Sequence, residues 1–281
     1  MTSFYPGPSQ VYPQIADYLQ DAFNSGILSA NHRSKQCVEL VKETIGLFHE
    51  KLNVPTDFSI YFTSSATECW EIISQSIISD RYVHLYNGAF GQKWYDYSKK
   101  LAKKECIGFE FGVDEILPSF AKNWDDIICI TQNETSNGSQ VQMEEIAKID
   151  LDNCLIAVDA TSSMAGIELD WVLADIWLAS VQKCFGLPAG LGIMVCSPKV
   201  MHVCEQTDPQ KHYNSFLNID KNMQEFQTTH TPNVLGIYLL NRVLKQIPNI
   251  SETSKRIKKQ AQDWYHLLEA NSEWEVLTKN S

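Results

Sequence analysis

Seven short apolar runs alternate with helix-patterned stretches along most of the chain, and this alternation constrains the fold more than any other feature. The runs are rich in β-branched and aromatic residues and are apolar on both faces, as strands buried in a parallel sheet are. They are Phe58–Phe62, Tyr82–Tyr86, Cys106–Phe111, Asp126–Thr131, Cys154–Asp159, Asp175–Ser180 and Gly192–Cys196. Strands separated by helices predict an α/β domain with a mainly parallel seven-stranded sheet and helices on both faces.

Helical and turn patterns divide the rest of the chain. Helices are predicted over Tyr18–Glu50 with a break near Gly26, and over Glu68–Ile78, Gln92–Lys104, Val234–Gln246 and Ser251–Ala270. Phe4–Pro13 carries three prolines, which favours an extended arm. Pro248-Asn249 is the best candidate for a domain boundary. We therefore predict an arm over residues 1–15, a large domain over residues 16–248 and the start of a small C-terminal domain over residues 249–281.

Charge and composition exclude several classes of function. A net charge of −11 repels nucleic acid and anionic membranes, so neither is an expected partner. The densest basic group, Lys99, Lys100, Lys103 and Lys104, is typical of a solvated helix face. No apolar stretch spans a bilayer, and the eight cysteines lack metal spacing, which predicts a cytoplasmic protein with no metal site. No glycine-rich nucleotide motif follows a strand.

Ligands of an open parallel sheet bind beyond the carboxyl ends of its strands, so the loops there are the candidate site. Ser65, Ala66 and Thr67 open a helix after the first run, where free N–H groups can bind an anion; an ordinary N-cap is the alternative. Phe90 lies between Gly88 and Gly91, which suggests an aromatic ring placed close to the backbone or to a ligand; a core residue after a turn is the alternative.

Two further loops carry charged residues. Asp159 ends an apolar strand, where burial is costly unless a cation meets it, although it can also cap a turn. Lys183 stands in apolar surroundings that lower its pKa and make it a nucleophile, unless it extends to the surface. An anion site, an aromatic ring, an acid and a lysine at one rim match pyridoxal 5'-phosphate (PLP).

The same segments resemble those of the class V aminotransferases, which have the fold-type I PLP architecture. Ser180-Val-Gln-Lys183, followed by Gly186-Leu-Pro-Ala-Gly190, is similar to the family's S-x-Q-K segment with a downstream P-x-G. Val158-Asp159-Ala160 adds the strand-ending acid. The resemblance runs from Pro6 to about Leu244.

The resemblance implies a role for each candidate residue. Lys183 would form the Schiff base with the cofactor, Asp159 would pair with the pyridine nitrogen and Phe90 would stack on the ring. Thr135 would contact the ring's phenolic oxygen or the substrate. The other implied cofactor contacts are Ser65, Ala66, Thr67, Thr161, Ser180, Gln182, His230 and Thr231. His230 and Thr231 would reach the phosphate of the neighbouring subunit, which implies a homodimer with shared active sites.

The resemblance also implies a reaction, a ping-pong transfer of an amino group between an amino acid and a 2-oxo acid. His32 and Arg33 match a pair that lies near the substrate's acidic group in phosphoserine aminotransferases, which favours that type over alanine–glyoxylate aminotransferases. Cysteine desulfuration and kynurenine cleavage are the other PLP reactions considered. Relatives continue past Ser281 into a small domain with a carboxylate-binding arginine, so a fragment, a reduced domain or an inactive cofactor-binding relative is the further alternative.

Overall fold

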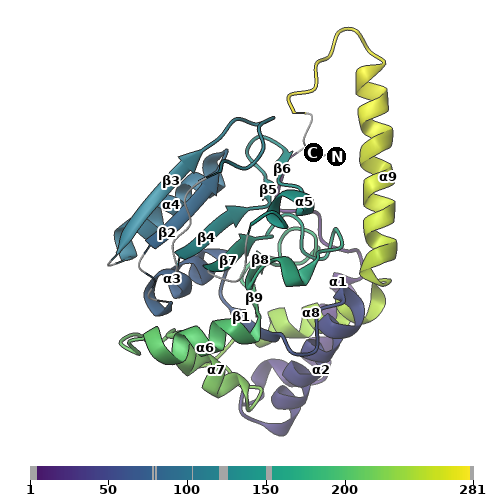
Figure 1. The fold of residues 1–281 in the computed structure, drawn as a ribbon. Coiled ribbons are helices and arrows are strands. Elements are labelled where there is room, and N and C mark those ends of the chain that lie inside the picture. Colours follow the sequence, from purple (N-terminus) through teal and green to yellow (C-terminus); the bar gives the residue numbers. More distant parts are fainter. Residues whose placement is uncertain are drawn as a thin grey trace.

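A seven-stranded sheet forms the centre of this computed structural model, which describes residues 5–77, 79, 81–102, 104–119, 126–149 and 154–278 (Figure 1). Phe4, Ile78, Lys103 and residues 279–281, which the sequence predictions included, lie outside this part. The strands follow the order β1 (Ser59–Thr63), β9 (Gly192–Cys196), β8 (Ile176–Ser180), β7 (Cys154–Asp159), β4 (Asp126–Thr131), β2 (Arg81–Tyr86) and β3 (Glu105–Glu110). Only β9 runs antiparallel to its neighbours, so the predicted mainly parallel sheet is confirmed.

Helices fill most of the connections between strands. The main ones are α1 (Ile15–Asn24), α2 (Lys35–Leu52), α3 (Ala66–Ser76), α4 (Ala89–Leu101), α6 (Pro198–Thr207), α7 (Phe216–Met223), α8 (Val234–Gln246) and α9 (Ile250–Glu269). The short elements are η1 (Ile27–Ser29), α5 (Met143–Ile146), η2 (Trp171–Leu173) and a hairpin of β5 (Asn133–Glu134) and β6 (Ser139–Gln140). The sequence analysis did not predict α6, α7 or the hairpin.

Alternating side chains of β8 show that helical segments cover both faces of the sheet. Ser180 points to one face, where its Oγ accepts a hydrogen bond from the first N–H of α3, that of Ala66. Trp177, an odd number of residues away, points to the other face and donates to the carbonyl of Trp171. The Trp171 indole in turn donates to the carbonyl of Leu52 at the end of α2.

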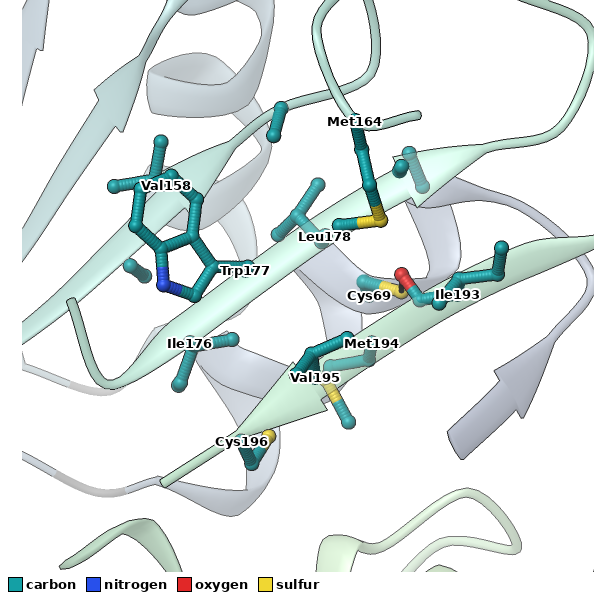
Figure 2. Packing of buried hydrophobic residues seen from close by; sticks show 14 of the residues in the cluster. Cys69, Val158, Met164, Ile176, Trp177, Leu178, Ile193, Met194, Val195 and Cys196 are labelled. Carbon is teal, nitrogen blue, oxygen red and sulfur yellow. Dashed lines mark hydrogen bonds between the residues drawn. The ribbon is translucent and has the colours of Figure 1, made fainter. Parts of the chain in front are cut away.

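The core lies on both sides of β8 and β9. Figure 2 shows Trp177 and Val158 on neighbouring strands, and Met164 and Cys69 beside the sheet. All four are essentially inaccessible to water. Burying a side chain of this size stabilises a fold by about 1.5–3 kcal/mol, so this cluster holds the strand ends in place.

Helix α9 extends away from the sheet as a single long element (Figure 1). Its buried residues are Ile250, Thr253 and Ser254, all in the first two turns. The predicted division of the chain at Pro248-Asn249 falls just before this helix and stays a prediction. Within the described residues, no helix is both long and apolar enough to cross a bilayer.

Candidate active site

Strand register brings the polar loops to one rim of the sheet. Thr131 at the end of β4 pairs with Asp159 at the end of β7, and Ser180 at the end of β8 pairs with Gly192. Gly192 pairs in turn with Thr63 at the end of β1. The segments that leave these strand ends therefore begin side by side, although they are far apart in the sequence.

Lys183 follows β8 and faces a cleft at this rim. Its Nζ donates a hydrogen bond to the Pro6 carbonyl at 3.0 Å. Burial lowers the pKa of Lys183, while the nearby Cys184 and Asp159 act in the opposite direction. A larger fraction of this amine is therefore neutral, and able to attack a carbonyl carbon, than in an exposed lysine.

The N-terminal arm packs against the lysine segment. Ser9 donates from its N–H to the Gln182 carbonyl at 2.8 Å and from its Oγ to the Lys183 carbonyl at 2.5 Å. Gly7 lies so close that a Cβ there would be 2.1 Å from the Lys183 Nζ. A side chain at this position would therefore displace the end of the Lys183 side chain from its present place.

Asp159 is a buried carboxyl group with two well-placed donors. Its Oδ1 accepts the Thr161 N–H at 2.9 Å, and its Oδ2 accepts the Trp70 indole N–H at 3.0 Å. Burial raises the pKa of Asp159, and the hydrogen bonds from Thr161 and Trp70 limit that rise. These donors favour the ionised carboxylate and fix its direction.

The N-terminus of α3 offers donors on the same rim. Ser65 is the N-cap, and its Oγ accepts the Glu68 N–H at 3.1 Å. The Ala66 N–H is already bonded to Ser180 Oγ at 2.8 Å. Thr67 is exposed in the first turn. N–H groups of a first turn, together with the helix dipole, favour a bound anion.

A carboxylate also lies at this helix terminus. Glu68 accepts hydrogen bonds from the Ser64 N–H at 2.6 Å and from the Tyr213 hydroxyl at 2.8 Å. Burial alone would raise the pKa of Glu68, but these hydrogen bonds lower it below its usual range. His230 lies edge-on to Tyr213, with ring centroids 6.0 Å apart, and its charge also lowers that pKa.

The cleft beside Lys183 has a volume of about 330 Å³. Thr135 lines it and shares a 2.7 Å hydrogen bond with Ser162. The other lining residues are Pro6, Ser9, Asn133, Glu134, Gly138, Ser139, Ser162, Lys183 and Cys184. Among the described residues of this wall, Lys183 is the only cation, and the remaining polar groups are hydroxyls, amides and one carboxylate.

Other predicted residues lie around the cleft or away from it. Phe90 is the second residue of α4 and is 43% exposed, which is high for an aromatic ring next to the rim. Thr231 is exposed in the loop before α8. His32 and Arg33 lie between η1 and α2 and do not line the cleft of their own chain.

Three residues of this region carry contacts that sequence reasoning missed, namely Trp70, Glu134 and Ser162. Trp70 lies in α3 with the spacing of a core residue, and nothing in that spacing indicates its bond to Asp159. Glu134 and Ser162 stand in segments rich in polar residues, where no single side chain is distinctive. In the part of the chain that the structure describes, no group of three His, Cys, Asp or Glu residues could hold a metal ion.

Comparison with known proteins extends these observations. The model of the family "Aminotransferase class-V" matches residues 110–281, more than half of the chain. Phosphoserine aminotransferase of Rhodococcus opacus is 28% identical over 243 residues, which cover 83% of this chain and 64% of that protein. The chain thus spans a little under two thirds of the length of this relative.

Solved structures show the same architecture. A phosphoserine aminotransferase from Cytophaga hutchinsonii superposes with a TM-score of 0.88 at 30% identity, over 96% of this chain and 77% of that one. The PLP-bound phosphoserine aminotransferase of Trichomonas vaginalis gives a TM-score of 0.83 at 20% identity, over 98% and 79%. An alanine–glyoxylate aminotransferase from Nostoc gives 0.75 at 18% identity, over 95% and 73%.

The fold, with a lysine and a buried acid at its rim, is that of a fold-type I PLP enzyme. The chain belongs to the class-V aminotransferase family. Membership indicates PLP as the cofactor, and the chemistry of the donors fits it. An amine of lowered pKa suits the aldehyde, a buried carboxylate suits the ring nitrogen, and the N-terminus of α3 suits the phosphate.

Proposed function

We propose that this chain is a PLP-dependent aminotransferase in which Lys183 binds the cofactor. The single observation that carries the proposal is the placement of Lys183 and Asp159 on neighbouring strand ends of one rim, close enough for their charges to interact. Lys183 lines a cleft with room for a bound group, and Asp159 ends a strand at the same rim of the sheet.

The residues of the chain would divide the chemistry among them. PLP supplies an electron sink for the carbanion of an amino acid. The Lys183 amine would take the proton from the substrate Cα as a base and would later deliver a proton as an acid. Asp159, held by Trp70 and Thr161, keeps the ring nitrogen protonated. Family membership and the lowered pKa of Lys183 support these roles.

The remaining candidate residues would bind and orient. Ser65, Ala66 and Thr67 would surround the phosphate at the N-terminus of α3, and Ser180 fixes that turn by accepting the Ala66 N–H. Phe90 covers one face of the ring, and Thr135 binds its phenolic oxygen or the substrate. Gln182 helps hold the ring. The exposure of Phe90 and the place of Thr135 in the wall of the cleft support these assignments.

The preferred substrate is phosphoserine, with a 2-oxo acid as its partner. The relatives from Rhodococcus opacus and Cytophaga hutchinsonii carry this name, which supports the choice. Desulfuration is disfavoured because burial raises the pKa of Cys184, the cysteine of the cleft, to about 11. A thiol of that pKa stays protonated near neutral pH and is a poor nucleophile.

A homodimer would complete the site. His32 and Arg33 do not line the cleft of their own chain, and Thr231 is exposed, which suits contacts with a second copy. His230 would act with Thr231 at the partner's phosphate. Mixing a Lys183→Ala variant with a His230→Ala variant should then restore one complete site per mixed dimer, measured as recovered activity. The eight cysteines, six of which are buried, support a reducing, cytoplasmic location.

The decisive experiment compares Lys183→Ala with Lys259→Ala, whose lysine is exposed and pairs with Asp263 on α9. After incubation with PLP and removal of the free cofactor, the wild type and Lys259→Ala should keep the visible absorbance of the lysine-bound cofactor, and Lys183→Ala should lose it. Borohydride reduction and peptide mapping should place the label on Lys183. A retained band in Lys183→Ala would overturn the proposal. Spectral conversion by phosphoserine, but not by alanine, tests the substrate.

A further inference from the structure

We propose that Glu134 is a positioning residue that fixes the loop of Phe90 against the loop of Thr135 and thereby sets the gap into which the cofactor ring fits. The inference rests on the proposed function for the identity of the ring. The hydrogen bonds that join Glu134 to the two loops, which we call the clamp, are a property of the protein alone. Glu134 lies in β5, directly before Thr135, and is 1% exposed.

Four donors converge on this one carboxylate. Oε2 accepts the N–H of Phe90 at 3.2 Å and the N–H of Gly91 at 3.1 Å. Oε1 accepts the N–H of Ser136 at 3.0 Å and its Oγ–H at 2.6 Å. One oxygen therefore holds the first turn of α4, and the other holds the turn after Thr135.

The two loops leave neighbouring strands, β2 and β4, and further bonds join them. Ser136 Oγ accepts the Ala89 N–H at 3.0 Å. Asn137 donates to the Asn87 carbonyl at 2.7 Å, and the Asn87 side chain donates to Ser139 Oγ at 2.8 Å. Glu134 is the charged member of this network, and its carboxylate accepts backbone N–H groups from both loops.

A carboxylate suits this position for two physical reasons. The first N–H groups of a helix have no partner within the helix, and the helix dipole favours a negative charge beside them. A buried carboxylate needs several donors to offset its desolvation, and four are present. A glutamine would keep one acceptor oxygen and turn an NH₂ group toward two donors, so it cannot reproduce the clamp.

Gly88 gives an independent view of how closely the loops approach. A Cβ at Gly88 would lie 2.3 Å from the Glu134 Cγ and 2.7 Å from the Ser136 Oγ. Real atoms do not approach so closely, so the loops can meet in this arrangement only with glycine there. A Gly88→Ala substitution should push the Phe90 loop away from Glu134 without removing its charge.

The test compares Glu134→Gln with a control, Glu115→Gln. Glu115 also accepts a backbone N–H, that of Gly112 at 2.6 Å, but it lies on the exposed loop after β3. Hydrogen exchange of the cofactor-free protein measures directly how firmly the backbone amides of the two loops are held. In Glu134→Gln, exchange should accelerate in residues 87–91 and in residues 133–139 together, and in Glu115→Gln neither segment should change.

The consequence for the cofactor is measured separately. Glu134→Gln and Gly88→Ala should each weaken PLP binding about tenfold or more, because lost charged hydrogen bonds are worth at least that factor. Both should alter the visible circular dichroism of the bound cofactor in the same direction. Unchanged exchange in both loops, or unchanged affinity and dichroism with only a lower melting temperature, would overturn the inference. If the wild type fails to bind PLP while the exchange result holds, the proposed function fails and the clamp stands.

Discussion

Trp70 and Asp159 form a buried hydrogen-bonded pair, and its contribution to the free energy of unfolding can be measured without an activity assay. The indole N–H lies 3.0 Å from Oδ2, and both side chains are 4% exposed. Replacing Trp70 by Phe removes this donor and leaves the carboxylate with one bonded oxygen. A hydrogen bond to a charged group contributes about 1.5–3 kcal/mol, so the free energy of unfolding of the cofactor-free protein should fall by about that amount near neutral pH.

The effect should depend on pH in a definite direction. Burial raises the pKa of Asp159, so the folded state holds this proton more tightly than the unfolded state does. This group therefore weakens the fold as the pH rises from its unfolded pKa through its folded pKa. The Trp70 N–H favours the ionised form, and its loss raises the folded pKa further. The difference between wild type and Trp70→Phe should then be largest above both folded pKa values and shrink in acid, where both carboxyls are protonated.

Trp94 provides a matched control. It is fully buried and stacks on Trp70 with ring centroids 5.8 Å apart and planes 10° apart. Among the described residues its indole N–H has no hydrogen-bond partner. Trp94→Phe therefore removes the same volume but no hydrogen bond to Asp159, so its cost should not follow the titration of Asp159. Urea unfolding midpoints at several pH values test both variants, and parallel pH profiles for the two would refute the reasoning.

Two further predictions concern other buried groups. Burial lowers the pKa of His84 from 6.5 to about 3, so the unfolded state binds a proton at a higher pH than the folded state does. The free energy of unfolding should therefore fall by up to about 1.4 kcal/mol per pH unit as the pH drops between those values. His84→Phe should flatten that slope in urea titrations, and an unaltered slope would contradict the assignment. Ser180→Ala leaves the buried Ala66 N–H without its acceptor, so it should lower the free energy of unfolding of the cofactor-free protein by about 1–3 kcal/mol in thermal unfolding. A change within about 0.5 kcal/mol, as for surface substitutions, would be inconsistent with this bond.

The sheet and its rim could be predicted because they depend on local patterns. The run Cys154–Asp159 is a strand with the predicted limits, and Asp159 ends it as expected. The direction of β9 could not be predicted, because Gly192–Cys196 is buried on both faces like its parallel neighbours and its composition carries no sign of its orientation. Pairing partners are chosen by tertiary contacts that a single run does not encode.

The start of α4 illustrates the same limit within the candidate site. The sequence predicts a helix from Gln92, since the two glycines before it favour a turn. The helix begins at Ala89 instead, because the Glu134 carboxylate accepts the N–H groups of Phe90 and Gly91 from a segment more than forty residues later. The partners of Lys183 and Asp159 in the arm and in α3 likewise come from distant segments. Residue types could be predicted locally, but these contacts could not.

The position of β1 at the edge of the sheet has a consequence for synthesis of the chain. Among the described strands, β1 pairs only with β9, which lies about 130 residues later in the sequence. At about 5–20 residues per second, a ribosome needs on the order of ten seconds to deliver that partner. During this interval Ile60, Tyr61 and Phe62, which are all buried in the folded protein, have no strand beside them. The nascent chain therefore carries an apolar, unpaired strand while these residues are translated, and holding chaperones should bind it there until β9 emerges.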